Sequence, residues 1–163
     1  DARDLRAHDV GESTAGLPLN LEQFEVRLPT ELEWEYACRS GTTTAFSFGN
    51  DIRLLKHYAW FLDNSDDWSF AGGGRRPNLR GLFDTHGNLF EWCHTTYAEY
   101  GADITEDVRA TSGHPPRVYR GGCWGVPAAD CRSANRTGIL PTFRNSILGF
   151  RVVLAPSTEP ADD

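Results

Sequence analysis

Two cysteines near residue 120 offer the side chains of this sequence best suited to redox or covalent chemistry. Cys123 and Cys131 lie in the stretch RGGCWGVPAADCRSANR, residues 120–136. Their separation permits a disulfide if the two Cα atoms come within about 7 Å, and it also permits a two-thiolate site for Cu(I). The alternative is that both are small buried side chains, since free cysteine is among the most buried residue types. For Cys131 we favour burial.

A catalytic thiol is a further possibility for Cys123. A cysteine becomes a nucleophile when a neighbouring base or positive charge lowers the pKa of its thiol. The histidines that could act as the base are His86, His94 and His114. Nothing in their sequence positions brings one of them to Cys123. A hydrolase that uses the Cys123 thiol as its nucleophile stays as a second alternative function.

The remaining cysteines, Cys38 and Cys93, add no metal-binding pattern. The four cysteines form no C-x-x-C pair, which makes a structural zinc site unexpected. A chain of 163 residues is also too long to need a disulfide framework for stability. Cysteine usage therefore leaves the cellular compartment open.

Length and charge restrict the class of protein. The 163 residues suffice for one domain, which we place at 1–154, followed by a disordered tail at 155–163. The formal net charge of −7 disfavours nucleic-acid binding, and no apolar run approaches the 18 residues of a membrane span. Methionine is absent, even at position 1, so we expect a domain trimmed at its N-terminus from a longer polypeptide.

One segment has a clear helical pattern. The stretch RLPTELEWEYACRSG predicts a helix at 30–39, in which Thr30 and Glu33 form a capping box. Gly41 follows as a favourable C-terminal stop. The apolar residues of the helix are expected to be partly buried: Leu32, Trp34, Tyr36 and Ala37.

Most of the remaining sequence reads as short strands between loops. Strand-like runs occur at 42–49, 57–61, 88–92, 117–122 and 150–154. The stretches at 63–78 and 133–149 are rich in glycine, asparagine and serine and predict loops. One helix, several short strands and long loops indicate the α+β class. Such long irregular segments usually carry function or a metal.

Four segments together resemble a known family. They are RLPTELEWEYACRSGT (27–42), GLFDTHGNLFEW (81–92), RVYRGGCW (117–124) and GFRVVL (149–154). In this order and at these distances they resemble the sulfatase-modifying-factor family, which includes the formylglycine-generating enzyme. The resemblance implies a C-type lectin-like variant, an α+β fold with few regular elements and long ordered loops. It also implies that the last strand, Phe150–Leu154, pairs with a strand near the N-terminus.

The resemblance bears directly on the two cysteines. Members that generate formylglycine hold Cu(I) with two cysteines and use O₂ to oxidise a substrate cysteine to an aldehyde. By alignment, Cys123 falls where the family has serine, and Cys131 lies outside the copper-ligand positions. The resemblance therefore implies a non-oxidase member that serves as a ligand- or protein-binding accessory domain. A copper-dependent oxidase acting on a sulfatase cysteine stays as an alternative, and Cu(I) is expected only in that case.

In this family the turn DTHGNLFE wraps a structural Ca²⁺. The ligands that the resemblance implies are the side chains of Asp84 and Glu91 and the backbone carbonyls of Gly87 and Leu89. Calcium prefers such mixtures of carboxylate and carbonyl oxygens. The alternative is an ordinary turn in which Glu91 pairs with an arginine. A second family calcium site suggests Asn64, Asp66 and Asp67 as further candidates.

A binding surface is expected between residues 120–145 and the loop at 60–76. Its candidate ligand-binding residues are Trp60, Trp124, Asn135, Arg136 and Arg144, and the ligand could be a peptide, a protein or a carbohydrate. Planar guanidinium groups also suit structural pairing with buried carboxylates. We therefore expect an architectural role for the arginines at 120, 132, 136 and 151, with Glu31, Glu33, Glu35 and Glu91 as partners.

Overall fold

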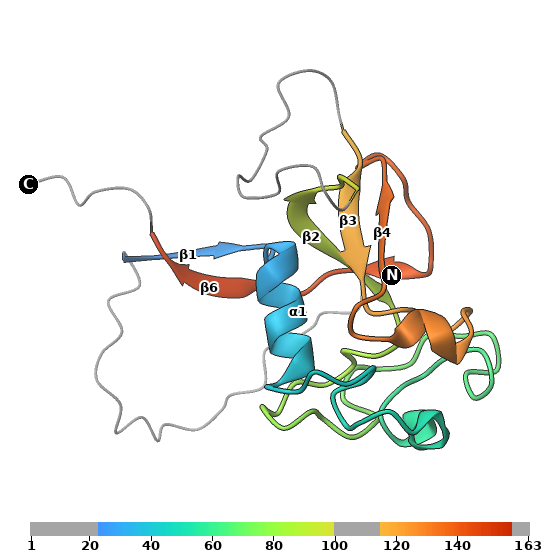
Figure 1. Cartoon of the computed structure of the whole chain (residues 1–163). Helices are drawn as coiled ribbons and strands as arrows, with labels where there is room; N and C mark the ends of the chain where they lie inside the picture. The colour runs from blue at the N-terminus through green and yellow to red at the C-terminus, as the bar shows by residue number, and fades with distance from the viewer. Residues whose placement is uncertain (1–22, 100–114, 158–163) are drawn as a thin grey trace, which may run out of the picture.

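The computed structural model of the chain describes residues 23–99 and 115–157. Long connecting segments join a few short elements (Figure 1). This mixed α+β arrangement with little regular structure is the class that the sequence predicted. The helices are α1 (Glu31–Arg39) and the 3-10 helices η2 (Ile52–His57) and η3 (Ala128–Cys131). The strands are β1 (Phe24–Arg27), β2 (Phe90–Thr96), β3 (Arg117–Arg120), β4 (Arg136–Ile139), β5 (Leu148–Gly149) and β6 (Val153–Pro156).

Helix α1 confirms the predicted helix and its capping box. The Thr30 hydroxyl accepts the Glu33 amide at 3.2 Å, and the Glu33 carboxylate accepts the Thr30 amide at 2.8 Å. The helix ends at Ser40, whose φ of 53° is left-handed. The expected apolar face is wrong in part, because Leu32 and Tyr36 are 80% and 63% exposed. The face that packs inward carries Glu31, Trp34 and Cys38.

The main sheet has the strand order β4-β3-β2-β5. All neighbours in it are antiparallel except β2 and β5, which are parallel. Strands β2 and β3 confirm the strands predicted at 88–92 and 117–122. The loop predicted at 133–149 is wrong in part, because it contains β4 and β5. Strand β4 has four residues and pairs with β3, and β5 has only two residues and pairs with β2. Such short strands, in a stretch rich in glycine, asparagine and serine, leave no clear local pattern.

The strands predicted at 42–49 and 57–61 are not formed. The first segment contains only an isolated bridge between Phe46 and Gly49, and the second begins in the last residue of η2. Phe46 and Phe61 are instead buried in one hydrophobic cluster with Leu55, Ala59 and Cys131. Core positions and strands favour the same aromatic residue types, so the aromatic pattern of these segments wrongly predicted strands.

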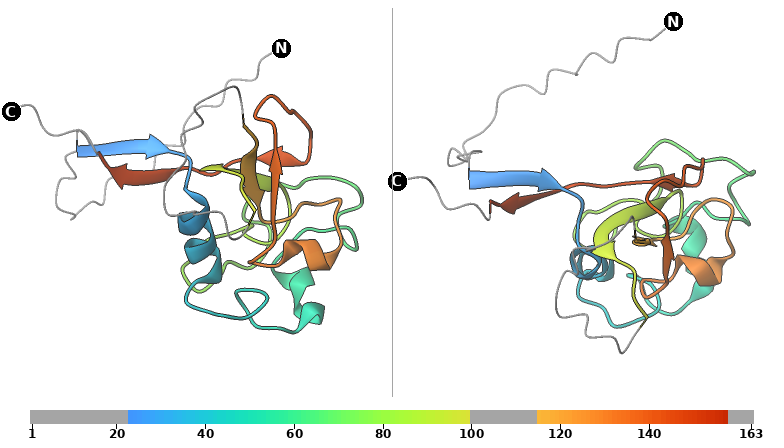
Figure 2. Two further views of the ribbon diagram at one scale, coloured as in Figure 1. Left: turned by 45° about the horizontal axis from the view of Figure 1, so that its top comes forward. Right: turned by 90° about the horizontal axis from the view of Figure 1, so that it is seen from above.

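Strands β1 and β6 form a separate antiparallel ribbon, in which Val26 is opposite Leu154. The ribbon projects to one side of the rest of the fold (Figure 2). This confirms that the last strand pairs with one near the N-terminus. The predicted bounds are wrong, because the strand begins at Val153 and not at Phe150, and it runs two residues past its predicted end at Leu154. Ala155 and Pro156 therefore lie in the strand and not in a disordered tail. Their pairing with β1 supplies the backbone hydrogen bonds that order them.

A second hydrophobic cluster lies between α1 and the main sheet and is made of Trp34, Cys38, Cys93 and Val118. Tyr97 packs against its edge. The cluster fixes the inner face of α1 against β2 and β3. In the described ranges, no helix has the length and apolar character needed to cross a membrane.

Candidate functional site

The loop that follows β3 brings the two candidate cysteines onto neighbouring segments. Gly121 and Gly122 have left-handed φ values of 98° and 78°. A Cβ atom on Gly122 would lie 2.6 Å from the sulfur of Cys131. Only glycine permits this approach, so the loop carrying Cys123 packs directly on η3.

Both cysteines are free thiols in the interior. Cys123 is 1% exposed and Cys131 is fully buried. Burial raises the pKa of both thiols, and at Cys123 the amides of Gly125 and Val126 offset this only in part. The burial that we favoured for Cys131 is therefore confirmed, and the disulfide alternative is not formed. Neither thiol has the lowered pKa of an activated cysteine nucleophile.

His86 is buried with both ring nitrogens occupied. Its Nε2 accepts the Ser47 amide at 3.0 Å and lies 2.9 Å from the Ser47 hydroxyl. Its Nδ1 therefore carries the proton and donates to the Cys131 carbonyl at 2.8 Å. Burial, with a smaller effect of Arg39, lowers the pKa of His86 to about 4. The neutral ring thus links the segment around Ser47 to η3. Because both of its nitrogens are already hydrogen-bonded, it does not serve as the base of Cys123. His114 lies outside the described residues.

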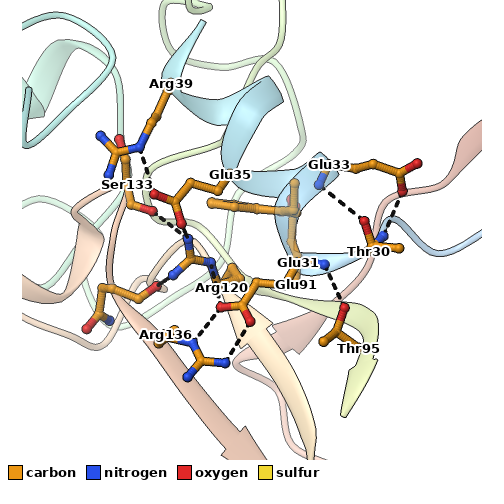
Figure 3. A network of polar contacts seen from close by, with 12 residues as sticks. Thr30, Glu31, Glu33, Glu35, Arg39, Glu91, Thr95, Arg120, Ser133 and Arg136 are labelled. Carbon is orange, nitrogen blue, oxygen red and sulfur yellow. Dashed lines mark hydrogen bonds and ion pairs between the residues drawn. The ribbon is translucent and has the colours of Figure 1, made fainter. Parts of the chain in front are cut away.

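Arginines and glutamates form a buried network between α1 and the main sheet (Figure 3). Arg120 is fully buried; it pairs with Glu35 and donates to the carbonyls of Ser133 at 2.9 Å and Asn135 at 2.6 Å. Arg136 holds the Glu31 carboxylate in two hydrogen bonds of 2.6 and 2.7 Å. These contacts give Arg120 and Arg136 the architectural role that the sequence predicted.

The five predicted ligand-binding residues do not share one pocket. Asn135 and Arg136 line a cavity of about 410 Å³. Arg144 lines another cavity, of about 390 Å³. Trp60 is stacked on Phe70 at a centroid distance of 3.8 Å and lies under the Arg75 guanidinium at 3.5 Å. Trp124 is joined to Trp60 only through the backbone, because the Trp124 amide donates to the Asn88 carbonyl and the Asn88 amide donates to Trp60.

The cavity beside Asn135 has more polar lining residues than the cavity at Arg144, and we call it the arginine pocket. Its polar lining residues are Arg39, Thr43, Thr44, Arg132, Asn135 and Arg136. Four of them were not predicted as site residues, namely Arg39, Thr43, Thr44 and Arg132. Arg39 is the last residue of α1 and Thr43 and Thr44 follow it, and nothing local indicates that this helix end lies beside β4.

The predicted calcium turn fits the ion at one ligand but not at another. One oxygen of Asp84 accepts the Gly73 amide at 2.7 Å, and the other is buried without a partner among the described residues. A free buried carboxylate oxygen suits a cation. Glu91 instead accepts Trp34 Nε1 at 2.6 Å and is held in two hydrogen bonds by Arg151. The alternative in which Glu91 pairs with an arginine is therefore what this structure contains.

The second candidate calcium loop uses its asparagine for another purpose. The Asn64 side chain accepts the Phe61 amide at 2.8 Å and donates to the Ala59 carbonyl at 3.0 Å. Asp66 and Asp67 are exposed and have left-handed backbones. Across residues 23–99 and 115–157, no group of three or more histidine, cysteine or acidic side chains could hold a metal ion.

Comparison with known proteins decides the family. The profile of the sulfatase-modifying factor enzyme 1-like domain matches residues 6–156. The chain belongs to this family. The serine/threonine-protein kinase pkn1 of Chlamydia pneumoniae is 33% identical over 87% of this chain and 23% of that protein. The formylglycine-generating enzyme of Streptomyces coelicolor is 30% identical over 77% of the chain and 45% of the enzyme. The inactive C-alpha-formylglycine-generating enzyme 2 of Mus musculus is 31% identical over 77% and 42%.

A solved structure agrees with this family assignment. Treponema denticola variable protein 1 superimposes with a TM-score of 0.71 and 37% identity, over 81% of this chain and 48% of that one. The chain thus spans less than half the length of each of these four relatives. The similarity establishes the family fold, and activity has to be argued from the site residues.

Proposed function

We propose that the chain is a non-oxidase member of the formylglycine-generating-enzyme-like family, built on a C-type lectin-like variant and acting as a ligand- or protein-binding accessory domain. The observation that carries this proposal is the burial of Cys131. Its side chain packs in the hydrophobic cluster of Phe46, Leu55 and Phe61. A cysteine in this position has no open coordination side toward a cleft.

Copper chemistry needs two thiolates that face a common, accessible site. Here Cys123 occupies the position where the family has serine, and both thiols near η3 are buried. The named relatives also support a role other than oxidation, since they include an inactive formylglycine-generating enzyme and a protein kinase.

A copper titration tests the proposal. The chain, kept in reductant, is titrated with Cu(I), and then incubated with O₂ and a cysteine-containing sulfatase peptide. We expect no tight thiolate-type binding, the same weak response in Cys123→Ala, and no aldehyde on the peptide. Tight binding that disappears in Cys123→Ala, together with aldehyde formation, would instead make the chain an oxidase.

Calcium is a second part of the proposal. The ion would be held by the Asp84 carboxylate and by the carbonyls of Gly87 and Leu89, while Glu91 keeps its pairing with Arg151. The unpartnered oxygen of Asp84 supports this arrangement. When bound, calcium would stabilise the turn between Asp84 and β2.

A further inference from the structure

We infer that the arginine pocket binds an oxyanion group, a phosphate monoester or a carboxylate, carried on a peptide. The inference rests on the proposed binding function and names its ligand chemistry. The pocket is formed by two segments: the end of α1 with the turn after it, which carries Arg39 and Thr43, and the stretch from Arg132 to Arg136. Its volume of about 410 Å³ exceeds that of a phosphate group and falls within the ordinary range for ligand pockets.

The charge around the pocket is locally positive in an acidic protein. Three guanidinium groups line it, from Arg39, Arg132 and Arg136, and the buried Arg120 donates to the carbonyl of Asn135 beside them. Among the described residues, Glu35 pairs with Arg39 and Arg120, and Glu31 pairs with Arg120 and Arg136. Arg132 is in none of these ion pairs, so it brings an unneutralised positive charge to the pocket of a chain whose net charge is −7. An anion is therefore attracted to this site against the average field of the molecule.

Two of the arginines are held in position while retaining donors for a ligand. Arg39 donates from Nε to Glu35 at 2.7 Å and from Nη1 to the Thr44 carbonyl at 3.0 Å. Arg132 donates from Nε to the Ala129 carbonyl at 2.8 Å, and its two Nη atoms have no partner in the described part of the chain. A guanidinium whose Nε is already fixed loses less rotamer entropy when its outer nitrogens bind an anion.

The other polar groups of the pocket have different roles. Arg136 uses its guanidinium on Glu31 and on the Ala98 carbonyl, so it supplies positive charge behind the site. Thr43 is exposed at the rim and can donate from its hydroxyl. Planar forks with hydroxyl groups beside them suit the several acceptor oxygens of a phosphate or carboxylate. Arg132, being exposed and outside every ion pair found in the described residues, is the residue most specific to ligand binding.

Calorimetric titration of the full chain at 50 mM salt tests the inference. The probes are a short Gly-Ser peptide with one phosphoserine, the same peptide with glutamate or unmodified serine in that place, and inorganic phosphate alone. We expect the anionic peptides to bind and the serine peptide not to bind. Arg132→Gln should weaken binding at least tenfold, and Arg132→Lys should weaken it less because the charge remains. Raising the salt to 200 mM should weaken binding further.

The matched control is Arg53→Gln, which changes an exposed arginine outside the pocket and should bind like the unchanged chain. Inorganic phosphate binding as tightly as the phosphopeptide would support the oxyanion site but identify a free anion as its ligand. No binding of any anionic probe, or equal binding by Arg132→Gln, would overturn the inference. The copper titration remains independent, because an oxidase could still possess or lack this pocket.

Discussion

Among single residues, His86 combines complete burial with a set of hydrogen bonds that only a neutral imidazole can make. It is 1% exposed, and its ring joins Ser47 to the carbonyl of Cys131. Protonation of Nε2 would remove the acceptor of the Ser47 amide. The residue therefore acts as a structural crosslink whose strength depends on pH.

Stability should fall as the pH is lowered from 7 to 5. The pKa of His86 is about 4 in the folded state against 6.5 as its ordinary value, so the unfolded chain binds the proton first. The stabilisation is complete above pH 6.5 and is lost toward pH 4, up to roughly 3 kcal/mol in total. Urea unfolding at pH 7, 6 and 5 measures it. In His86→Asn the change over this interval should shrink, and an unchanged pH dependence in that variant would contradict the assignment.

The choice of this interval separates His86 from the cap of α1. Hydrogen bonds from Arg27, with smaller contributions from Thr30, lower the pKa of Glu33 to about 2. Its ordinary value is 4.5, so the stability that depends on Glu33 is lost only below that pH. Above pH 5 the loss therefore reports mainly on histidine.

At the scale of elements, the turn from Asp84 to β2 depends on unusual backbone geometry. Asp84 and Asn88 both have left-handed φ values, 56° and 64°, and Gly87 has 96°. A Cβ atom on Gly87 would lie 2.3 Å from the Trp60 carbonyl oxygen. The turn thus packs closely on the loop at 60–76, where one Asp84 oxygen accepts the Gly73 amide and the other is buried without a partner among the described residues.

Calcium should stabilise this turn through Asp84. We expect the melting temperature of the chelator-treated chain to rise by roughly 5 °C when CaCl₂ is added well above its dissociation constant. Asp84→Ala should lose this response because the ion loses its carboxylate ligand. Asp63→Ala removes an exposed carboxylate from the neighbouring loop and should respond normally. Identical melting curves of the unchanged chain with calcium and with chelator would exclude the site.

At the scale of the whole molecule, the ribbon of β1 and β6 pairs the first strand of the described residues with the last. One side of the ribbon presents apolar side chains to solvent, with Val26 at 68% and Leu154 at 50% exposure. The adjacent residue Ala155 is 7% exposed and lies on the other side of the ribbon, opposite Glu25. This alternation follows from the two-residue period of a strand.

A charge at the buried position 155 should therefore destabilise the molecule, whereas one at the exposed position 154 should not. Ala155→Asp puts a carboxylate at a buried position directly opposite Glu25 and should lower the free energy of unfolding by about 2 kcal/mol. Leu154→Asp, one position earlier, should change it by about 0.5 kcal/mol or less. Guanidinium unfolding of both variants makes the comparison. Equal losses would show that the ribbon does not pack as described.

Helix α1 and strands β2 and β3 could be predicted from sequence because their signals are local, such as the capping box of Thr30 and Glu33. The pairing of β6 with β1 was predicted from the resemblance to the family. Strand β5 has only two residues and pairs with β2, which lies far earlier in the chain, and β4 lies in a stretch whose glycine, asparagine and serine content favours a loop. The segments around Phe46 and Phe61 were wrongly predicted as strands, because burial and strand propensity select the same aromatic residue types.

The sequence alone determined the family and the α+β class, because motif order and residue identity are written along the chain. Only the tertiary structure decided which groups meet: Glu91 with Arg151, His86 with the carbonyl of Cys131, and Arg39 with Arg132 around one pocket. These contacts join segments separated by 40 or more positions. Their geometry arises from packing and from the pairing of buried charges, which no local pattern encodes.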